Sequence, residues 1–230
     1  MEPDPGNAGV GNECRHYGQA PVFGPVFFVS NNPKNKQEGK KMNRKSHLKL
    51  RCLAECAIFV AMSVALSYLK IPIGLEFGGF GGSIDLVMIP LIIAAFRWGL
   101  GWGLGSGLVF GTLKFFLAGG VAINWQSMLL DYSIAYMFVG FAGLLKRKNG
   151  MIWLAALIGC ICRFVVHFVS GITIYAEYME DIFGLHMTNV WVYSALYNGS
   201  YMLPNTIIAI LVCILLSIPL KKYLNGEDLK

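Results

Sequence analysis

Apolar residues are gathered into long runs along the chain instead of being spread evenly. The runs are close to the ~20 residues that a helix needs to cross the ~30 Å hydrocarbon core of a membrane. Charged or glycine-rich stretches separate them. The pattern therefore predicts six membrane-spanning helices, at roughly residues 50–69, 84–98, 100–118, 127–145, 151–176 and 188–220.

The composition agrees with this class of protein. Of the 230 residues, 55% are hydrophobic and only 14% are charged, whereas about 25% of the residues of an average soluble domain are charged. We therefore expect an all-α fold, a polytopic membrane protein with six transmembrane helices. The net charge of +6 is interpreted by its location along the chain and not as a sign of nucleic-acid binding.

The basic residues predict the orientation of the helices, because Lys and Arg are enriched in cytoplasmic loops. They lie before the first span, at the second turn, at the fourth turn and after the last span: Arg44, Lys45, Lys49, Arg51, Arg97, Lys146, Arg147, Lys148, Lys221 and Lys222. The connections on the opposite side contain Lys70 as their one basic residue. Both termini are therefore predicted to be cytoplasmic.

Ionisable residues interrupt the fifth predicted span, in the stretch RFVVHFVSGITIY. Arg163, His167, Gly171 and Tyr175 recur at every fourth position, which places them on one face of a helix. Ionisable groups inside a membrane are costly and usually mark a ligand, an ion path or a partner. The stripe predicts one wall of a functional site.

Two other spans bring polar and aromatic groups to a similar depth. The fourth span contributes Asp131 and Tyr132, and the sixth contributes Tyr193, Tyr197 and Asn198. Aromatic faces attract a desolvated cation by about 2 kcal/mol or more, and a carboxylate balances its charge and binds an amino group. We expect a flat, partly cationic ligand in the outer half of the membrane.

Each of these residues also has a purely structural interpretation. Asp131 can pair with Arg163 for packing alone. His167 can be a buried histidine with satisfied hydrogen bonds, and the tyrosines can belong to an interfacial aromatic belt. Tyr193 and Asn198 lie about 140° apart on an ideal helix, so their spacing alone does not place both in one pocket.

Sequence motifs for catalysis are missing. The chain has no Walker A phosphate loop, no HExxH and no GxSxG, and an isolated Asp and His do not make a catalytic constellation. We expect no catalytic residue, no metal and no cofactor in this chain. If a solute is moved uphill at the expense of ATP, the ATPase is another chain.

Four stretches in order resemble the thiamine-specific S component (ThiT/YuaJ) family of energy-coupling-factor vitamin transporters. They are GGSIDLVMIPLIIAAFRWG (81–99), QSMLLDYSIAY (126–136), RFVVHFVSG (163–171) and VWVYSALYNGSYMLP (190–204). The resemblance implies a protein of the bacterial plasma membrane, surrounded by lipid, that captures thiamine from outside with high affinity. It also implies delivery inward in a complex with a T component and two ABC ATPase subunits.

The resemblance also implies which residues bind the ligand. They are Phe110, Asp131, Tyr132, His167, Gly171, Tyr175, Tyr193 and Asn198, with Trp125 and either Phe80 or Phe77 as aromatic residues that close the pocket. The best-known members have Glu at the position of Asp131 and Trp at the positions of Tyr175 and Phe110. A shorter carboxylate and weaker cation–π partners affect the pose and affinity of the ligand more than its class.

The first helix is implied to dock on the T component through small residues. Ala57, Ala61 and Ala65 recur at every fourth position, a spacing that permits the close approach of another helix. Alone, this spacing is a weak signal, since alanine is common in any helix.

Residues 1–41 differ in kind from the rest, being rich in Gly, Pro and Asn and without periodicity. The stretch QEGKKM (37–42) is what a purine-rich ribosome-binding site would encode before a start codon. The stretch EPDPGNAGVGN (2–12) back-translates to a sequence resembling part of the thiamine-pyrophosphate riboswitch. We expect Met42 to be the true start, residues 1–41 to be a non-native or disordered extension, and residues 42–230 to be the membrane domain.

Three other functions stay open at this point. The protein can be an S component for another vitamin or for the precursor hydroxymethyl pyrimidine, which a ligand panel separates from thiamine. It can be an intramembrane enzyme with Asp131 and His167 as acid and base, which would form product from its ligand. It can also be a stand-alone carrier, which would transport without ATPase partners.

Overall fold

The structure, a computed structural model, describes residues 33–72, 82–120, 122–179, 181–182, 184 and 186–229. The chain divides into two compact units, Met1–Met42 and Asn43–Lys230. The first unit is described from Pro33 on, where the backbone is helical. All the packing considered below lies within the second unit.

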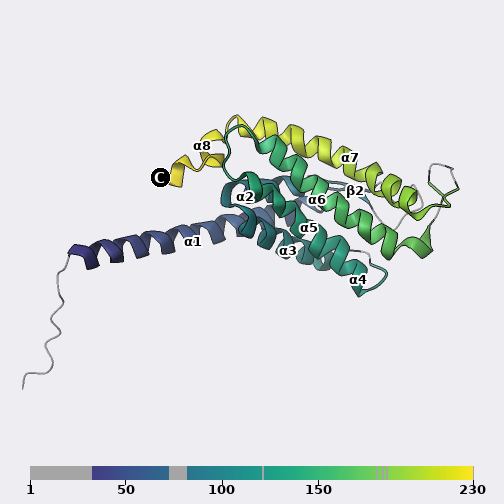
Figure 1. The fold of residues 1–230 in the computed structure, drawn as a ribbon, viewed down its shortest axis with the longest axis horizontal. Coiled ribbons are helices and arrows are strands. Elements are labelled where there is room, and N and C mark those ends of the chain that lie inside the picture. The colour runs from purple at the N-terminus through teal and green to yellow at the C-terminus, as the bar shows by residue number, and fades with distance from the viewer. Residues whose placement is uncertain are drawn as a thin grey trace, which may run out of the picture. The chain divides into compact units, whose positions relative to one another are not determined.

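The described residues are mostly helical (Figure 1), as the sequence predicts. The main helices are α1 (Pro33–Leu66), α2 (Met88–Trp98), α3 (Leu100–Leu117), α4 (Trp125–Met128), α5 (Ala135–Val139), α6 (Ile152–Thr173), α7 (Val190–Ser217) and α8 (Lys221–Leu224). The remaining helical turns are of the π or 3₁₀ type and not α-helical; they are η1 (Leu129–Ile134), η2 (Gly140–Leu145), η3 (Ala176–Tyr178) and η4 (Glu227–Leu229). Two strands of two residues, β1 (Ile71–Pro72) and β2 (Ser83–Ile84), pair antiparallel.

Four helical segments of the described chain are long and apolar enough to cross a membrane. They are Leu100–Leu117, Trp125–Leu145, Ile152–Thr173 and Val190–Ser217, and they coincide with the third to sixth predicted spans. The second predicted span forms a helix of 11 residues, which is about 17 Å long at 1.5 Å per residue. That the chain crosses the membrane six times, with both termini on the cytoplasmic side, therefore stays a prediction.

The short helix α2 is the centre of the core. All eleven of its residues are buried, and a helix that is apolar all round is stable only when other elements surround it. It contacts α3, α6 and α7, which lie around it in Figure 1. Its one charged residue, Arg97, is at its C-terminal end.

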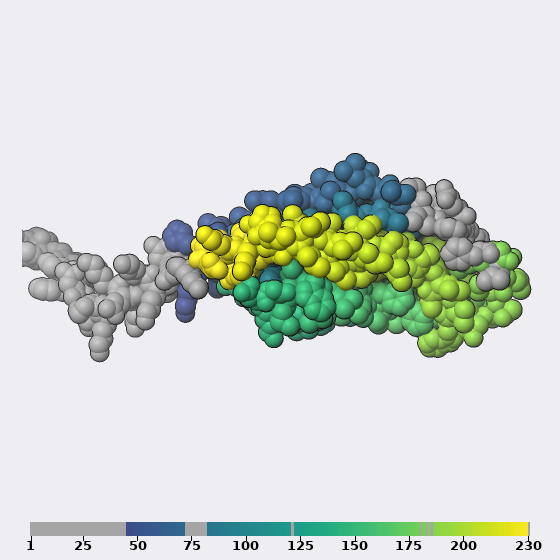
Figure 2. All heavy atoms as spheres, turned by 90° about the horizontal axis from the view of Figure 1, so that it is seen from above, coloured from purple at the N-terminus to yellow at the C-terminus, as the bar shows by residue number. Residues whose placement is uncertain are grey.

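Helices α6 and α7 lie side by side along most of their length (Figure 1). Figure 2 shows α7, in yellow-green, running along one face of the second unit from the yellow C-terminal residues. The segment around β2 is fixed to α7 by Asn205. Its amide oxygen accepts the backbone N–H of Asp85 at 2.9 Å, and its amide nitrogen donates to the carbonyl of Ser83 at 2.7 Å. These two hydrogen bonds hold Asp85 close to the start of α2.

Glycines allow α3 to pack directly on the backbone of the Trp125–Leu145 stretch. A Cβ atom at Gly107 would overlap the carbonyl of Tyr136, and one at Gly111 would overlap the carbonyl of Tyr132. Gly103 and Gly140 meet in the same way further along. Membrane helices associate closely where small residues face each other, so the glycine-rich third span brings α3 against the stretch that carries Asp131 and Tyr132.

We expect Gly107→Ala to destabilise the fold, because the new methyl group must push the two backbones apart, at a cost of about 1–3 kcal/mol. Gly105→Ala is the matched control, since a Cβ atom at Gly105 meets open space. Thermal unfolding of the purified proteins in detergent measures both. A midpoint for Gly107→Ala equal to that of Gly105→Ala would contradict the close contact.

Candidate ligand-binding cavity

A cavity of about 520 Å³ opens between the C-terminal half of α6, the N-terminal half of α7, the end of α3 and the stretch that begins at α4. Seven of the ten residues that the resemblance implies line it: Asp131, Tyr132, His167, Gly171, Tyr175, Tyr193 and Asn198. Its size and its mixture of aromatic and polar walls are typical of small-molecule sites. Residues from three predicted spans therefore meet at one place.

Asp131 and His167 face each other across the cavity wall. The carboxylate Oδ1 of Asp131 lies 3.2 Å from Nδ1 of His167, and the two side chains are 15% and 9% exposed. The imidazole also lies edge-on to the ring of Tyr201, with 6.1 Å between ring centroids. Its other nitrogen, Nε2, is buried and has no hydrogen-bond partner among the described residues.

The turn that carries Asp131 and Tyr132 is not a regular α-helix. Residues Leu129–Ile134 form a π-helical turn between α4 and α5. Such turns are rare and occur frequently at functional sites. The ring of Tyr132 packs edge-on against Phe115, with 5.2 Å between centroids, which holds this side of the wall against the end of α3.

Gly171 lies where α6 and α7 approach each other closely beside the cavity. A Cβ atom there would overlap Oγ of Ser194 on α7, so the glycine lets α6 and α7 approach. Ser194 then donates from Oγ to the carbonyl of Phe168 at 2.9 Å. The glycine lines the cavity and at the same time fixes the distance between its two main walls.

Tyr193 and Asn198 both line the cavity, although they lie on different sides of α7. The helix is continuous from Val190 to Ser217, so the two residues flank the site without a break between them. Asn198 donates to the carbonyl of Ser194 at 3.0 Å, and its Oδ1 accepts from the Tyr201 hydroxyl at 2.7 Å. Its amide therefore orients the wall of the cavity as well as facing it.

Two of the implied residues that the structure describes, Phe110 and Trp125, do not line the cavity. Phe110 is fully buried and packs edge-on against Tyr136, with 4.7 Å between centroids, so it supports the wall from behind. Trp125 is the first residue of α4 and is 68% exposed, outside the lining. Phe77 and Phe80 lie outside the described residues.

The cavity contains a polar floor, of which the sequence analysis identified Arg163 but not Lys114. Lys114 of α3 donates to Asp85 Oδ2 at 2.9 Å and to the Tyr136 hydroxyl at 2.5 Å. Arg163 also donates to that hydroxyl, at 2.9 Å, and its guanidinium lies 4.1 Å from the centre of the Tyr136 ring. Lys114 inside an apolar span was the signal that could have revealed this floor, because an intramembrane charge implies a partner.

The floor and the wall differ in charge. Lys114 and Arg163 are buried together with one carboxylate, Asp85, whereas Asp131 lies against the histidine. Nε and Nη1 of Arg163 have no hydrogen-bond partner among the described residues. The cavity can therefore hold a ligand with a cationic, aromatic part near Asp131 and an acceptor oxygen near Arg163. No group of three His, Cys, Asp or Glu residues in the described chain could hold a metal ion.

Comparison with known proteins identifies the family of the chain. Residues 53–225 match the family model Thia_YuaJ, described as thiamine transporter protein. The chain belongs to this family. Two relatives named thiamine transporter ThiT come from Bacillus subtilis, with 31% identity over 71% of this chain and 88% of its own, and from Lacticaseibacillus paracasei, with 28% identity over 72% and 86%.

A solved structure has the same fold. It is ThiT from Listeria monocytogenes, which matches with a TM-score of 0.67 and 25% identity over 76% of this chain and 98% of its own length. The residues that match the family model, 53–225, include all the helices that line the cavity.

We expect the Lys114–Asp85 pair to be essential as a pair. Lys114→Met leaves a buried carboxylate without its cation, which costs about 3–5 kcal/mol. Adding Asp85→Asn to Lys114→Met should recover part of this loss, because the carboxylate that lost its cation is then neutral, while Arg163 keeps its hydrogen bond to the Tyr136 hydroxyl. Thermal unfolding of the two single variants and the double variant gives the coupling, and additive losses would contradict the ion pair.

Proposed function

We propose that this protein is the thiamine-binding S component of an energy-coupling-factor importer. The observation that carries the proposal is the cavity in which Asp131 and His167 meet aromatic side chains, in a chain of the Thia_YuaJ family. Thiamine has an aminopyrimidine ring, a cationic thiazolium ring and a hydroxyethyl tail. Each of the three parts has complementary groups in this cavity.

The aromatic and cationic parts of thiamine are assigned to the wall around Asp131. Its carboxylate balances the thiazolium charge and accepts from the pyrimidine amino group. The stacked rings of Tyr193 and Tyr197, 6.0 Å apart and nearly parallel, offer apolar faces to a flat ligand. The positive charge of Arg163, which lines the cavity, suits the hydroxyl oxygen and disfavours the cationic ring, so the charges of the cavity favour one orientation.

Delivery inward is proposed to require partner chains. The small residues Ala57, Ala61 and Ala65 are all exposed on α1, which supports a face where another helix approaches closely. The basic residues that follow η2 and α7 support a cytoplasmic position for that end. The cavity then opens to the outside of a bacterial plasma membrane, and a T component with two ATPase subunits supplies the energy for release.

We expect Asp131→Ala and His167→Ala each to weaken thiamine binding at least tenfold, or ~1.4 kcal/mol. Both substitutions remove a polar group that the ligand needs inside a buried site. Quenching of tryptophan fluorescence by thiamine measures the affinity of the purified variants. The exposed pair Asp181 and His186, with Oδ1 and Nδ1 2.9 Å apart, provides matched control substitutions to alanine. Unchanged affinity in both cavity variants would remove the proposed site.

A ligand panel distinguishes thiamine from its precursor. Thiamine should bind more tightly than hydroxymethyl pyrimidine alone, by about tenfold or more, because only the whole vitamin places a cation beside Asp131. The same fluorescence titration gives both affinities. Equal affinity for the two compounds would identify the precursor as the proper ligand and would exclude a role for the thiazolium ring.

A further inference from the structure

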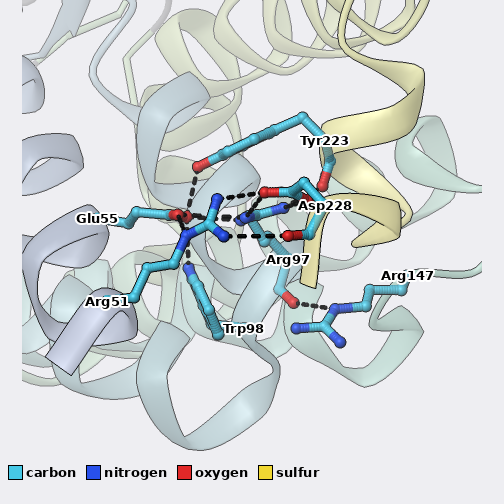
Figure 3. A network of polar contacts seen from close by, with 7 residues as sticks. All are labelled: Arg51, Glu55, Arg97, Trp98, Arg147, Tyr223 and Asp228. Carbon is cyan, nitrogen blue, oxygen red and sulfur yellow. Dashed lines mark hydrogen bonds and ion pairs between the residues drawn. The ribbon is translucent and has the colours of Figure 1, made fainter. Parts of the chain in front are cut away.

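A second polar cluster lies beyond the other end of α7 from the cavity. It joins Arg51 and Glu55 of α1 and Arg97 of α2 to the C-terminal tail, which we define as residues Lys221–Leu229 (Figure 3). Trp98 and Arg147 complete it. The ligand site uses none of these residues, so their arrangement needs its own explanation.

Arg97 is at the centre of this cluster and its side chain is fully buried. A guanidinium has five N–H donors, and each has an acceptor here. Glu55 accepts from Nε at 2.6 Å and from Nη2 at 3.2 Å. The tail provides the other three acceptors: Asp228 Oδ1 at 3.0 Å, Asp228 Oδ2 at 2.7 Å and the carbonyl of Tyr223. The tail therefore accepts three of the five hydrogen bonds that this buried cation donates.

Glu55 accepts hydrogen bonds from side chains of α1, α2 and the tail. Besides Arg97, it accepts from Arg51 Nε at 2.8 Å, from Trp98 Nε1 at 3.0 Å and from the Tyr223 hydroxyl at 2.7 Å. Because Glu55 belongs to α1, these bonds attach this helix to α2 and to the tail. Figure 3 shows the side chains converging on the carboxylate from separate elements.

Apolar contacts reinforce the same attachment. Cys52 and Cys56, the buried residues of α1 next to Glu55, form a small cluster with Trp98, and Leu229 of the tail packs against it. The opposite face of α1 carries the exposed residues Ala57 and Ala61. The tail thus packs against the buried face of α1, and the exposed face of the same helix is the one proposed to dock on the T component.

We propose that Asp228 is a positioning residue for docking: through Arg97 and Glu55, the tail fixes the orientation in which α1 presents Ala57, Ala61 and Ala65 to the T component. This inference rests on the proposed function. It assigns a role in transport to residues that line no part of the thiamine cavity. Hydrogen bonds from Arg97 lower the pKa of Asp228 to about 2, so Asp228 stays charged even in mild acid, and substitution instead of acidification is the way to break the contact.

The test compares Asp228→Asn with Glu227→Gln, a neighbouring exposed carboxylate, and with the conservative Asp228→Glu. Each full-length variant is produced alone and together with the T component and ATPase subunits of the same organism. Alone, it is titrated with thiamine, and amide hydrogen exchange is measured over residues 51–58 of α1. In the complex, the fraction of the chain that co-purifies with the T component and the rate of thiamine uptake are measured.

We expect Asp228→Asn to leave the thiamine affinity within about twofold, to increase exchange in α1, and to lower co-purification and uptake at least about fivefold, the lower end of typical coupling between sites. Glu227→Gln should change none of these, and Asp228→Glu should recover co-purification in part. Unchanged exchange in α1 would overturn the proposal, as would unchanged co-purification. A parallel loss of thiamine affinity would overturn it too, because the effect would then be on the whole fold.

Failure of the proposed function is seen separately. If the unaltered protein does not bind thiamine, the titration shows this before any variant is compared. The exchange of α1 still reports whether Asp228 holds the helix, since that measurement needs neither ligand nor partner.

Discussion

A buried charge is stabilised by a partner inside the protein, because an apolar surrounding offers no water to replace it. Lys114 with Asp85 satisfies this condition on the floor of the cavity, and Arg97 with Glu55 and Asp228 satisfies it beyond the far end of α7. Both pairings join elements that are distant in the sequence. The charges therefore specify which helices are neighbours, while the apolar residues supply most of the burial.

The position of the ligand site depends on how closely the backbones approach. Glycines of α3 let the Trp125–Leu145 stretch lie directly on it, and Gly171 lets α7 approach α6. Larger residues there would widen the space between the walls and separate Asp131 from His167, which are now 3.2 Å apart. The cavity is a product of packing at small residues, although its chemistry comes from large ones.

The sequence predicts the main helices well, since hydropathy and the four-residue period locate the third to sixth spans and the stripe from Arg163 to Tyr175. It predicts less of how residues on different helices meet. Lys114 was not identified because its partner Asp85 is 29 positions away. Phe110 was placed at the ligand by its position in the family motif, but its ring packs behind Tyr136. Such outcomes depend on helix rotation, which no local pattern encodes.

The π-helical turn at Leu129–Ile134 has a consequence for how this site can change over time. Such a turn accommodates one residue more than a regular helix would, without loss of the helix on either side. A single-residue deletion there would rotate Asp131 relative to α5 while leaving in place the contacts of Gly107 and Gly103, which meet Tyr136 and Gly140 beyond the turn. In this part of the cavity wall, the number of residues in the turn changes the site as effectively as the identity of a side chain. Relatives with different ligand preferences can therefore differ by a one-residue gap instead of a substitution.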